Sequence, residues 1–319
     1  MSRQFINQLA DGDALDEIYI ASEKQLRTNR NGNLYLQLRL SDKTGCLTAM
    51  LWNAQQRHYE SFANGDYVRV NGAAQIYNGT MQILAKSIEK SDAEVDETDF
   101  VVIAAAAMDQ LVARLTEMLR QMKNVHLRNL ADCFLLDEDF MRQFRLAPAG
   151  VKNHHAYRGG LLEHVVSLME VAMLVAPRYE DLDPDVLLMG AFLHDVGKIR
   201  ELTYDPDLGY SDAGQLIGHL VQGVTILDEK ISETGQMSGE EFPQELANHL
   251  RHMIVSHHGH YEYGSPKLPM TMEAIALHYL DNLDAKLHSV RQLIEEDVNK
   301  ESAWTVYNPG LQRKIFKGS

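Results

Sequence analysis

The chain has 319 residues, 45% of them hydrophobic and 24% charged, and its 45 Asp and Glu outnumber its 30 Lys and Arg to give a net charge of −15. This composition is that of an ordinary globular protein and excludes an intrinsically disordered chain. The two cysteines, Cys46 and Cys133, lie far apart, which excludes a disulfide scaffold and a cysteine-based zinc site and favours a reducing compartment.

The hydropathy of the chain bears on its location. The first residues, MSRQFINQLADGD, lack the apolar core of a signal peptide, and no apolar run of about 18 residues is long enough to span a bilayer. The sequence therefore predicts a cytoplasmic protein with no membrane partner. Its acidic charge argues against a broad basic surface, although local patches can still bind phosphates.

An apolar period of two residues indicates β-strands in the first part of the chain. The clearest strand signal is at 33–41, where leucines alternate with other side chains, and further strands are expected at 46–52, 67–71, 73–77 and 80–85. A short helix is expected at 54–62. Five strands with one helix among them are typical of an OB barrel, whose order is three strands, a helix and two strands. Residues 1–90 are therefore predicted to form a five-stranded OB β-barrel.

The same alternation predicts an aromatic and basic surface outside the barrel. Tyr35 and Arg39 fall opposite the leucines of their strand, and Trp52 falls opposite the apolar residues of the next strand. Bases stack on aromatic rings while cations follow the phosphates, so these three residues are predicted to bind a nucleic-acid strand. Packing against a second domain is the alternative use of this face.

After residue 104 the apolar period becomes that of helices. Residues 91–105 are predicted to be an acidic linker, residues 106–153 a helical connector, residues 154–300 the second domain and residues 301–319 a tail. Helices are expected from residue 104 to about 119 and at 124–135, 160–176, 184–196, 214–234, 240–256 and 270–297, with a small hairpin at 201–212. The predicted fold class is therefore α+β multidomain, a β-barrel followed by an all-α bundle.

Histidine is concentrated in the second domain. Twelve of the fourteen histidines lie between His154 and His288. Imidazole and carboxylate without thiolate suit Mn, Fe, Co, Ni or Zn. Buried residues satisfied by hydrogen bonds are the alternative, but burial of several such groups without a cation is costly. The predicted metal ligands are His164, His194, Asp195, His219, His257, His258 and Asp281.

The order of these ligands predicts two ions that share one carboxylate. The first ion is expected between His164, His194, Asp195 and Asp281. The second is expected where His219 and one of the adjacent histidines at 257–258 meet the other side of Asp195. A single ion stays open, with His258 then contacting phosphate or orienting its neighbour.

Other polar residues near these ligands are candidates for supporting roles. Lys198 directly follows the HD pair and its glycine, and we expect it to stabilise phosphoryl oxygens; a cation at a helix C-terminus is the alternative. His154, His155 and Arg158 precede a Gly-Gly turn, where they are expected to face the scissile phosphate or to cap the loop. Asp284, one helical turn after the last predicted ligand, either orients a histidine or lies exposed.

The residues resemble the HD superfamily of metal-dependent phosphohydrolases, whose pattern is H…HD…D. The resemblance rests on HDVGK at 194–198, LIGHL at 216–220, SHHG at 256–259 and LHYLDNLDAK at 277–286. With NHHAYRGGLLEHV at 153–165 and the N-terminal barrel, the chain looks like the YhaM-type 3′→5′ exoribonucleases. That resemblance implies Mn²⁺-dependent phosphodiester hydrolysis in a helical HD domain and an OB domain that grips single strands.

One element departs from another branch of the superfamily. Cyclic-dinucleotide phosphodiesterases carry a GYP element after their paired histidines, whereas this chain reads YEYGSP at 261–266. The sequence therefore disfavours cyclic dinucleotides as the substrate.

The predicted function is metal-dependent phosphodiester hydrolysis on single-stranded RNA, from the 3′ end, with DNA left open. Asp195 and Lys198 are the expected catalytic residues, and one or two divalent ions, above all Mn²⁺, are the expected cofactor, which lowers the pKa of a water to about 7. A homo-oligomer is left open. The alternatives are a nucleotide or cyclic-nucleotide phosphohydrolase and a nucleic-acid-binding regulator with a vestigial HD site.

Overall fold

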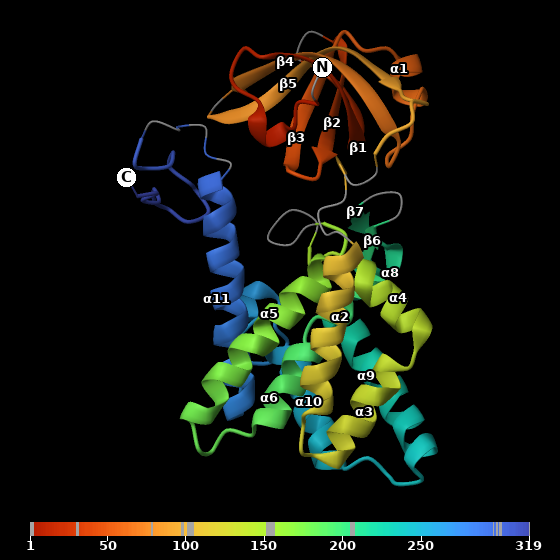
Figure 1. Cartoon of the computed structure of the whole chain (residues 1–319), viewed down its shortest axis with the longest axis vertical. Helices are drawn as coiled ribbons and strands as arrows, with labels where there is room; N and C mark the ends of the chain where they lie inside the picture. The colour runs from red at the N-terminus through yellow and green to blue at the C-terminus, as the bar shows by residue number, and fades with distance from the viewer. Residues whose placement is uncertain are drawn as a thin grey trace. The chain divides into compact units, whose positions relative to one another are not determined.

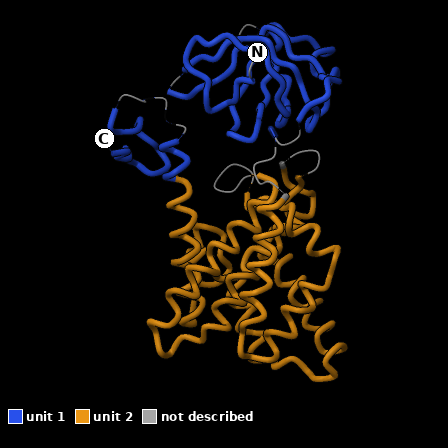
Figure 2. Tube along the Cα trace, in the orientation of Figure 1, with its two compact units in different colours: residues 1–104, 205–208, 290–319 blue, residues 105–204, 209–289 orange. Residues whose placement is uncertain are grey.

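The computed structural model describes residues 3–29, 32–77, 79–96, 99–100, 105–150, 157–204, 208–295, 297, 299 and 302–318. The chain divides into two compact units, shown in Figure 2. One unit covers residues 1–104, 205–208 and 290–319, and the other covers residues 105–204 and 209–289. The segment 106–153, predicted as a separate connector, thus belongs to the same unit as the predicted metal ligands.

The first unit contains a closed five-stranded barrel, drawn in red and orange in Figure 1. Its elements are η1 (Ile6–Gln8), β1 (Ala14–Thr28), β2 (Leu34–Asp42), β3 (Gly45–Trp52), α1 (Gln56–Glu60), β4 (Tyr67–Tyr77) and β5 (Thr80–Lys90). The strands pair in the order β1-β2-β3-β5-β4, with β4 closing on β1; β3 and β5 are parallel and the other pairs antiparallel. The predicted OB barrel is therefore confirmed.

The barrel core follows the alternation seen in the sequence. Leu36, Leu38 and Leu40 of β2 are at most 1% exposed. The intervening side chains of the strand are half-buried, and Trp52 at the end of β3 is exposed. The predicted outward placement of the aromatic and basic residues on β2 and β3 is thus correct.

Two strands differ from the prediction. The first strand, β1, lies ahead of the expected ranges, and its pattern is interrupted where Glu23 adopts a φ of 49° and the pairing register shifts. The ranges 67–71 and 73–77 form one strand, β4, with an irregularity after Asn71. Gly72 is required there, because a Cβ would lie 2.4 Å from the carbonyl oxygen of Leu84 on the neighbouring strand.

The second unit is helical (Figure 1). Its elements are α2 (Ala105–Arg120), α3 (Val125–Leu135), α4 (Glu138–Leu146), α5 (Gly160–Val175), η3 (Ala176–Arg178), α6 (Pro184–Leu193), α7 (Lys198–Glu201), β6 (Leu202–Tyr204), β7 (Leu208–Tyr210), α8 (Asp212–Ile217), α9 (His219–Ser238), α10 (Gln244–Ser256), η4 (Tyr261–Tyr263) and α11 (Met272–Glu295). Helix α5 packs against α2, α4 and α6, and α10 packs against α6 and α9. Four phenylalanines, at 134, 140, 144 and 192, are in ring contact in the core.

The helix predicted at 214–234 is in fact two helices, α8 and α9. They meet at Gly218, whose φ of 79° no helix tolerates and few side chains adopt. Helix α4 was not predicted, although Asp137 before it accepts a hydrogen bond from the N–H of Phe140 at 2.9 Å, as an N-cap does. The predicted hairpin at 201–212 is present as β6 and β7.

Helix α5 is a long and apolar helix. The window Gly160–Arg178 has the length and composition of a membrane span, yet 56% of it is buried inside the protein. A buried apolar helix is what the core of a helical unit requires. We therefore assign α5 to the core.

The tail after α11 forms a short antiparallel ribbon within residues 302–318. Isolated bridges pair Trp304 with Phe316 and Asn308 with Arg313. The ribbon is tied to Asp297, which accepts hydrogen bonds from the N–H of Val306 at 3.2 Å and from the Lys317 ammonium at 2.6 Å.

Candidate metal centre

The seven predicted ligands come together from five places in the helical unit. His164 lies on α5, the His194–Asp195 pair follows α6, and Asp281 lies on α11. His219 is the first residue of α9, and the His257–His258 pair follows α10. His164, His194, Asp195 and His257 are at most 3% exposed.

The first group of side chains surrounds the Nε2 atoms of His164 and His194, which lie 3.3 Å apart. Asp281 Oδ1 is 3.3 Å from His164 Nε2 and 3.9 Å from His194 Nε2. Asp195 Oδ2 is 3.3 Å from His194 Nε2. Two imidazole nitrogens and two carboxylates thus face one point from α5, α11 and the end of α6.

The second group lies on the other side of Asp195. Asp195 Oδ1 is 3.5 Å from His219 Nε2 and 3.6 Å from His257 Nε2. His219 Nε2 is in turn 3.2 Å from His258 Nε2. Three sets of ligand atoms have spacings short enough to hold an ion: His164 with His194 and Asp195, His194 with His257 and Asp281, and His219 with His257 and His258.

A hydrogen bond at Nδ1 fixes the orientation of each of these five imidazoles. Carboxylates hold two of them: Asp284 lies 2.7 Å from His164 Nδ1 and Glu201 lies 3.1 Å from His219 Nδ1. Backbone carbonyls hold the other three, which are His194 (Ala191 O, 2.8 Å), His257 (Ile254 O, 2.8 Å) and His258 (Tyr263 O, 2.9 Å). Each ring therefore turns its Nε2 toward the cluster, as a metal-ligating histidine does.

The carboxylate between the two groups has an unsatisfied acceptor. Asp195 Oδ1 is buried and accepts no hydrogen bond from any residue that the structure describes. A buried carboxylate oxygen without a donor is unfavourable unless a cation meets it. The donor set and this oxygen therefore fit a divalent ion, and the ligand groups found among the described residues contain no cysteine.

Burial and charge shift the titration of the cluster in opposite directions. Burial alone would lower the pKa of His164, but Asp281 and Asp284 outweigh it and raise this pKa to about 9. Burial lowers the pKa of His257 to about 4. Burial opposes ionisation of Asp195, yet Lys198 and His194 hold the pKa of this carboxyl well below its usual range. A cation at the first group would take the place of the His164 proton, since histidine ligates in its neutral form.

Lys198 lies directly against the central carboxylate. Its Nζ donates to Asp195 Oδ2 at 2.5 Å and to the carbonyl oxygen of Ala149 at 2.6 Å. The cation is mostly buried, with 14% of its side chain exposed. The ammonium is thus bonded to the central carboxylate and to a backbone carbonyl, and its contact with a phosphoryl oxygen stays a prediction.

Gly197 allows the HD turn to touch α9. Its φ of −62° is right-handed, so the backbone conformation alone does not require a glycine. A Cβ at this position would lie 2.0 Å from the carbonyl oxygen of His219 and 2.6 Å from the N–H of Gly223. The glycine is required by this close approach, which sets the position of His219.

Substitution Gly197→Ala should therefore displace α9 and damage the second ligand group. We expect the free energy of unfolding to fall by about 1–3 kcal/mol, as for other overpacked cores, and Mn²⁺ to bind more weakly. Chemical denaturation and metal titration measure the two effects. The matched control is Gly235→Ala within α9, where a Cβ would meet no atom closer than 3.5 Å. Equal behaviour of the two variants would contradict the close-approach explanation.

The structure places the remaining predicted site residues as follows. Arg158 is exposed just before α5, whereas His154 and His155 lie outside the described residues. On the barrel, Tyr35 and Trp52 are directly opposed on β2 and β3, with ring centroids 5.0 Å apart. Arg39 is half-buried beside Cys46 and lies 3.8 Å from Glu23, so its charge is partly neutralised.

Sequence reasoning missed two groups that support the ligands. Glu201 was not singled out, because nothing in its spacing marks it as the partner of His219. His278 was not among the predicted site residues either, yet its Nδ1 lies 2.8 Å from the carbonyl oxygen of His257 and its ring packs on Gly259. The role left open for Asp284 is settled geometrically, since it contacts His164 and also accepts a hydrogen bond from Ser167 at 3.0 Å.

Removing the negative charge behind a ligand should weaken metal binding without unfolding the protein. We expect Glu201→Gln and Asp284→Asn each to lower Mn²⁺ affinity about 10–100-fold. A neutral amide in place of the carboxylate makes the imidazole that it contacts a weaker ligand for the metal. Equilibrium dialysis with elemental analysis measures the affinity. The control is Glu229→Gln, whose carboxylate pairs with Arg200 on the surface. Unchanged affinity in both ligand-supporting variants would refute this role.

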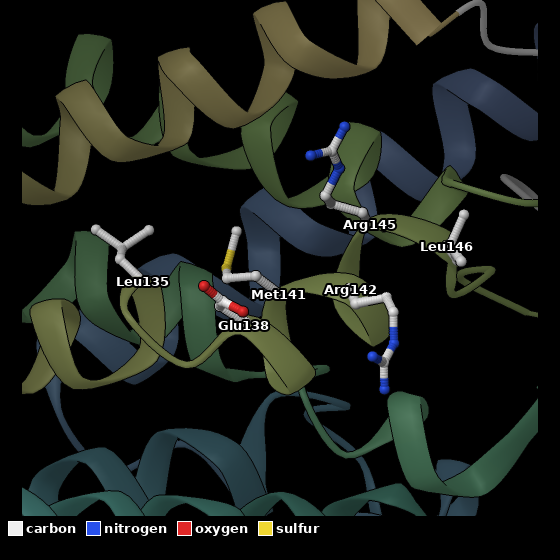
Figure 3. A pocket seen from close by; sticks show the side chains of 6 residues that line it. All are labelled: Leu135, Glu138, Met141, Arg142, Arg145 and Leu146. Carbon is white, nitrogen blue, oxygen red and sulfur yellow. The ribbon is translucent and has the colours of Figure 1, made fainter.

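One hollow in the helical unit lies apart from the cluster. It has a volume of about 470 Å³ and is lined by Leu135, Glu138, Met141, Arg142, Arg145 and Leu146 (Figure 3). Its guanidinium groups point apart in Figure 3, and they pair with Asp139 and Asp109 at 2.9 and 2.5 Å. None of the ligand side chains lines it, so we assign it no part in the chemistry.

Comparison with known proteins agrees with this geometry. Residues 161–286 match the HD domain, and residues 21–91 match the OB-fold nucleic acid binding domain. The chain is 34% identical over 288 residues to the 3′-5′ exoribonuclease YhaM of Bacillus subtilis (strain 168), which covers 89% of this chain and 88% of that protein. It is 36% identical over 292 residues to the YhaM protein of Geobacillus sp. (strain WCH70), covering 90% and 87%. The chain therefore belongs to the YhaM family of HD-domain proteins.

Proposed function

We propose that this protein is a metal-dependent 3′→5′ exoribonuclease that hydrolyses single-stranded RNA. The observation that carries the proposal is the pair of ligand groups on either side of Asp195, in a chain that also holds an OB barrel. The YhaM relatives, which are named 3′-5′ exoribonucleases, support the polarity and the substrate.

The ligand set supports a divalent transition metal, and we propose Mn²⁺. His164, His194, Asp195 and Asp281 would hold one ion, and His219, His257 and His258 would hold a second together with Asp195. Ions in such a site lower the pKa of a water and polarise phosphoryl oxygens. The two free cysteines support a cytoplasmic location for this chemistry.

The protein's own residues prepare the site for a phosphodiester. The outer hydrogen bonds keep the imidazoles oriented, so that no reorganisation is needed when the substrate arrives. Lys198 is the cation nearest to the central carboxylate, and we assign it to stabilise the phosphoryl oxygens as their negative charge grows. The carboxyl of Asp195 stays ionised, and it offers one oxygen to each of the two ligand groups.

The test is digestion of 5′-labelled single-stranded RNA with Mn²⁺, resolved on a sequencing gel. We expect labelled products that shorten progressively from the 3′ end and that are absent when a chelator is added. Immediate release of a labelled mononucleotide would overturn the polarity. No cleavage of RNA, with hydrolysis of nucleotides or cyclic nucleotides instead, would overturn the substrate. A DNA strand of the same sequence shows whether the 2′-hydroxyl is read.

A further inference from the structure

The tail after α11 contains a short antiparallel ribbon. We call residues 302–318 the C-terminal ribbon; they form the dark blue segment at the end of the chain in Figure 1. Its two arms are held by Thr305, whose N–H donates to Ile315 O at 2.9 Å, and by the Lys317 N–H, which donates to Ala303 O at 2.8 Å. Thr305 is only 1% exposed. The ribbon therefore has an inner face, and its alternate residues form an outer face.

The outer face of the C-terminal ribbon carries aromatic rings. Trp304 and Phe316 are directly opposed across the two arms, with ring centroids 5.1 Å apart and an angle of 54° between the rings. Trp304 is 50% exposed and Phe316 is 57% exposed. Exposed rings held by a backbone ladder lose little entropy when they bind a flat partner.

The charge of the ribbon is opposite to that of the protein. Residues 302–318 include Arg313, Lys314 and Lys317 and contain no Asp or Glu, although the whole chain has a net charge of −15. Lys317 is occupied by the buried carboxylate of Asp297. Arg313 and Lys314 are exposed, and neither is ion-paired with a carboxylate of the described residues. These two cations thus precede Phe316 of the aromatic pair by three and two residues on the same arm of the ribbon.

We propose that the outer face of the C-terminal ribbon binds single-stranded RNA, with bases stacked on Trp304 and Phe316 and phosphates against Arg313 and Lys314. Rings for stacking and cations for the backbone are the two components of single-strand binding. The barrel presents the same arrangement, an opposed pair of rings on two antiparallel strands, at Tyr35 and Trp52. The inference deepens the proposed function, because it takes the same RNA as the ligand.

The choice of RNA over a protein partner follows from the combination of groups. A second copy of this acidic chain would attract the cations, but its carboxylates are not each joined to a flat ring that could stack on Trp304 and Phe316. A polyanion whose monomers each carry a flat ring satisfies both at once. A second copy is the competing occupant, and the oligomeric state distinguishes it from RNA.

The tryptophan content of the chain allows a direct test. Trp52 and Trp304 are the two tryptophans of the sequence, so Trp52→Phe leaves Trp304 as the single tryptophan and keeps a ring on the barrel. Unstructured RNA of about 20 nucleotides, longer than one OB site, is titrated into the full chain in chelator, where it is not digested. We expect RNA to quench the fluorescence of Trp304 and to protect this residue from quenching by acrylamide. The midpoint of the fluorescence titration should equal the Kd measured by RNA anisotropy.

Substitutions separate stacking from charge. We expect Trp304→Ala in the otherwise unchanged chain to weaken RNA binding at least about fivefold, and Trp304→Phe to restore most of it. The control is Tyr179→Ala, an aromatic of similar exposure in the helical unit, which should change nothing. Arg313→Gln with Lys314→Gln should reduce the salt slope of log Kd by about 1.4, or 0.7 for each phosphate contact. The matched charge control is Lys123→Gln with Arg178→Gln, both exposed.

Three results would overturn the inference. The first is unquenched Trp304 at saturating RNA. The second is unchanged RNA affinity in Trp304→Ala with a changed oligomeric state by light scattering, which would assign the ribbon to a second copy. The third is unchanged affinity with a lowered melting temperature, which would make the rings structural. Because binding is measured without metal, a failure of RNA hydrolysis by the unaltered protein would refute the proposed function alone.

Discussion

Replacing Asp195 with Ala should abolish RNA hydrolysis and most metal binding while leaving the helical unit folded. This carboxylate is the one ligand shared by both groups, with Oδ2 facing His194 and Oδ1 facing His219 and His257. Its removal also takes away the partner of Lys198, which then places a cation where the ions would bind. We expect activity to fall to the background seen with chelator.

Three measurements decide this prediction. Elemental analysis reports the metal content, circular dichroism the helical content, and the sequencing gel the hydrolysis. The control variant is Asp139→Ala, whose side chain is 75% exposed and pairs with Arg142 on the surface. It should match the unaltered protein in all three. Near-normal turnover by Asp195→Ala would show that the ligand assignment is wrong.

Removing both rings of the barrel pair should weaken binding of single-stranded RNA by at least about tenfold. Each stacked base is worth roughly 1–3 kcal/mol, and Tyr35 and Trp52 lie side by side on the outer face. Trp52 is 48% exposed, so its loss leaves the barrel core intact. The variant is Tyr35→Ala with Trp52→Ala, and the measurement is RNA anisotropy at two salt concentrations alongside the melting temperature.

The competing use of these rings is contact with other protein surface. In that case the double variant would lose thermal stability and keep its RNA affinity. Arg39→Ala is a useful companion, because Arg39 lies 3.8 Å from Glu23 and its charge is partly neutralised. We therefore expect it to change the salt dependence of affinity only slightly, by less than one full phosphate contact.

The parts of the molecule that were predicted correctly are those with a strict period or a distinctive residue type. Alternation in β2 assigned Leu36 and Tyr35 to opposite faces, because a strand repeats every two residues. The clustering of the predicted His and Asp ligands was foreseeable because several such side chains in a buried region need partners, whereas their binding of a metal stays a prediction. Neither argument requires knowledge of which helices are neighbours.

The parts that were missed depend on contacts between distant segments. Glu201 lies 18 residues before His219 and has no spacing that marks it. Gly218 was read as an ordinary helical residue, although its φ of 79° divides α8 from α9. The interrupted pattern of β1 gave no two-residue period around Glu23. In each case the tertiary structure, rather than local preference, decides the outcome.

The division at Gly218 leaves α9 without a side chain to cap its first turn. Glu201 fills that role from another segment, since its Oε1 accepts the N–H of His219 at 3.0 Å and also lies 3.1 Å from Nδ1 of the same residue. One carboxylate therefore holds both the start of a helix and the ring that faces the metal. Occupancy of the centre should restrain this turn, so hydrogen exchange at residues 219–222 should slow when Mn²⁺ is added. At an ion concentration 100 times Kd, the free energy of unfolding should rise by about 2.7 kcal/mol.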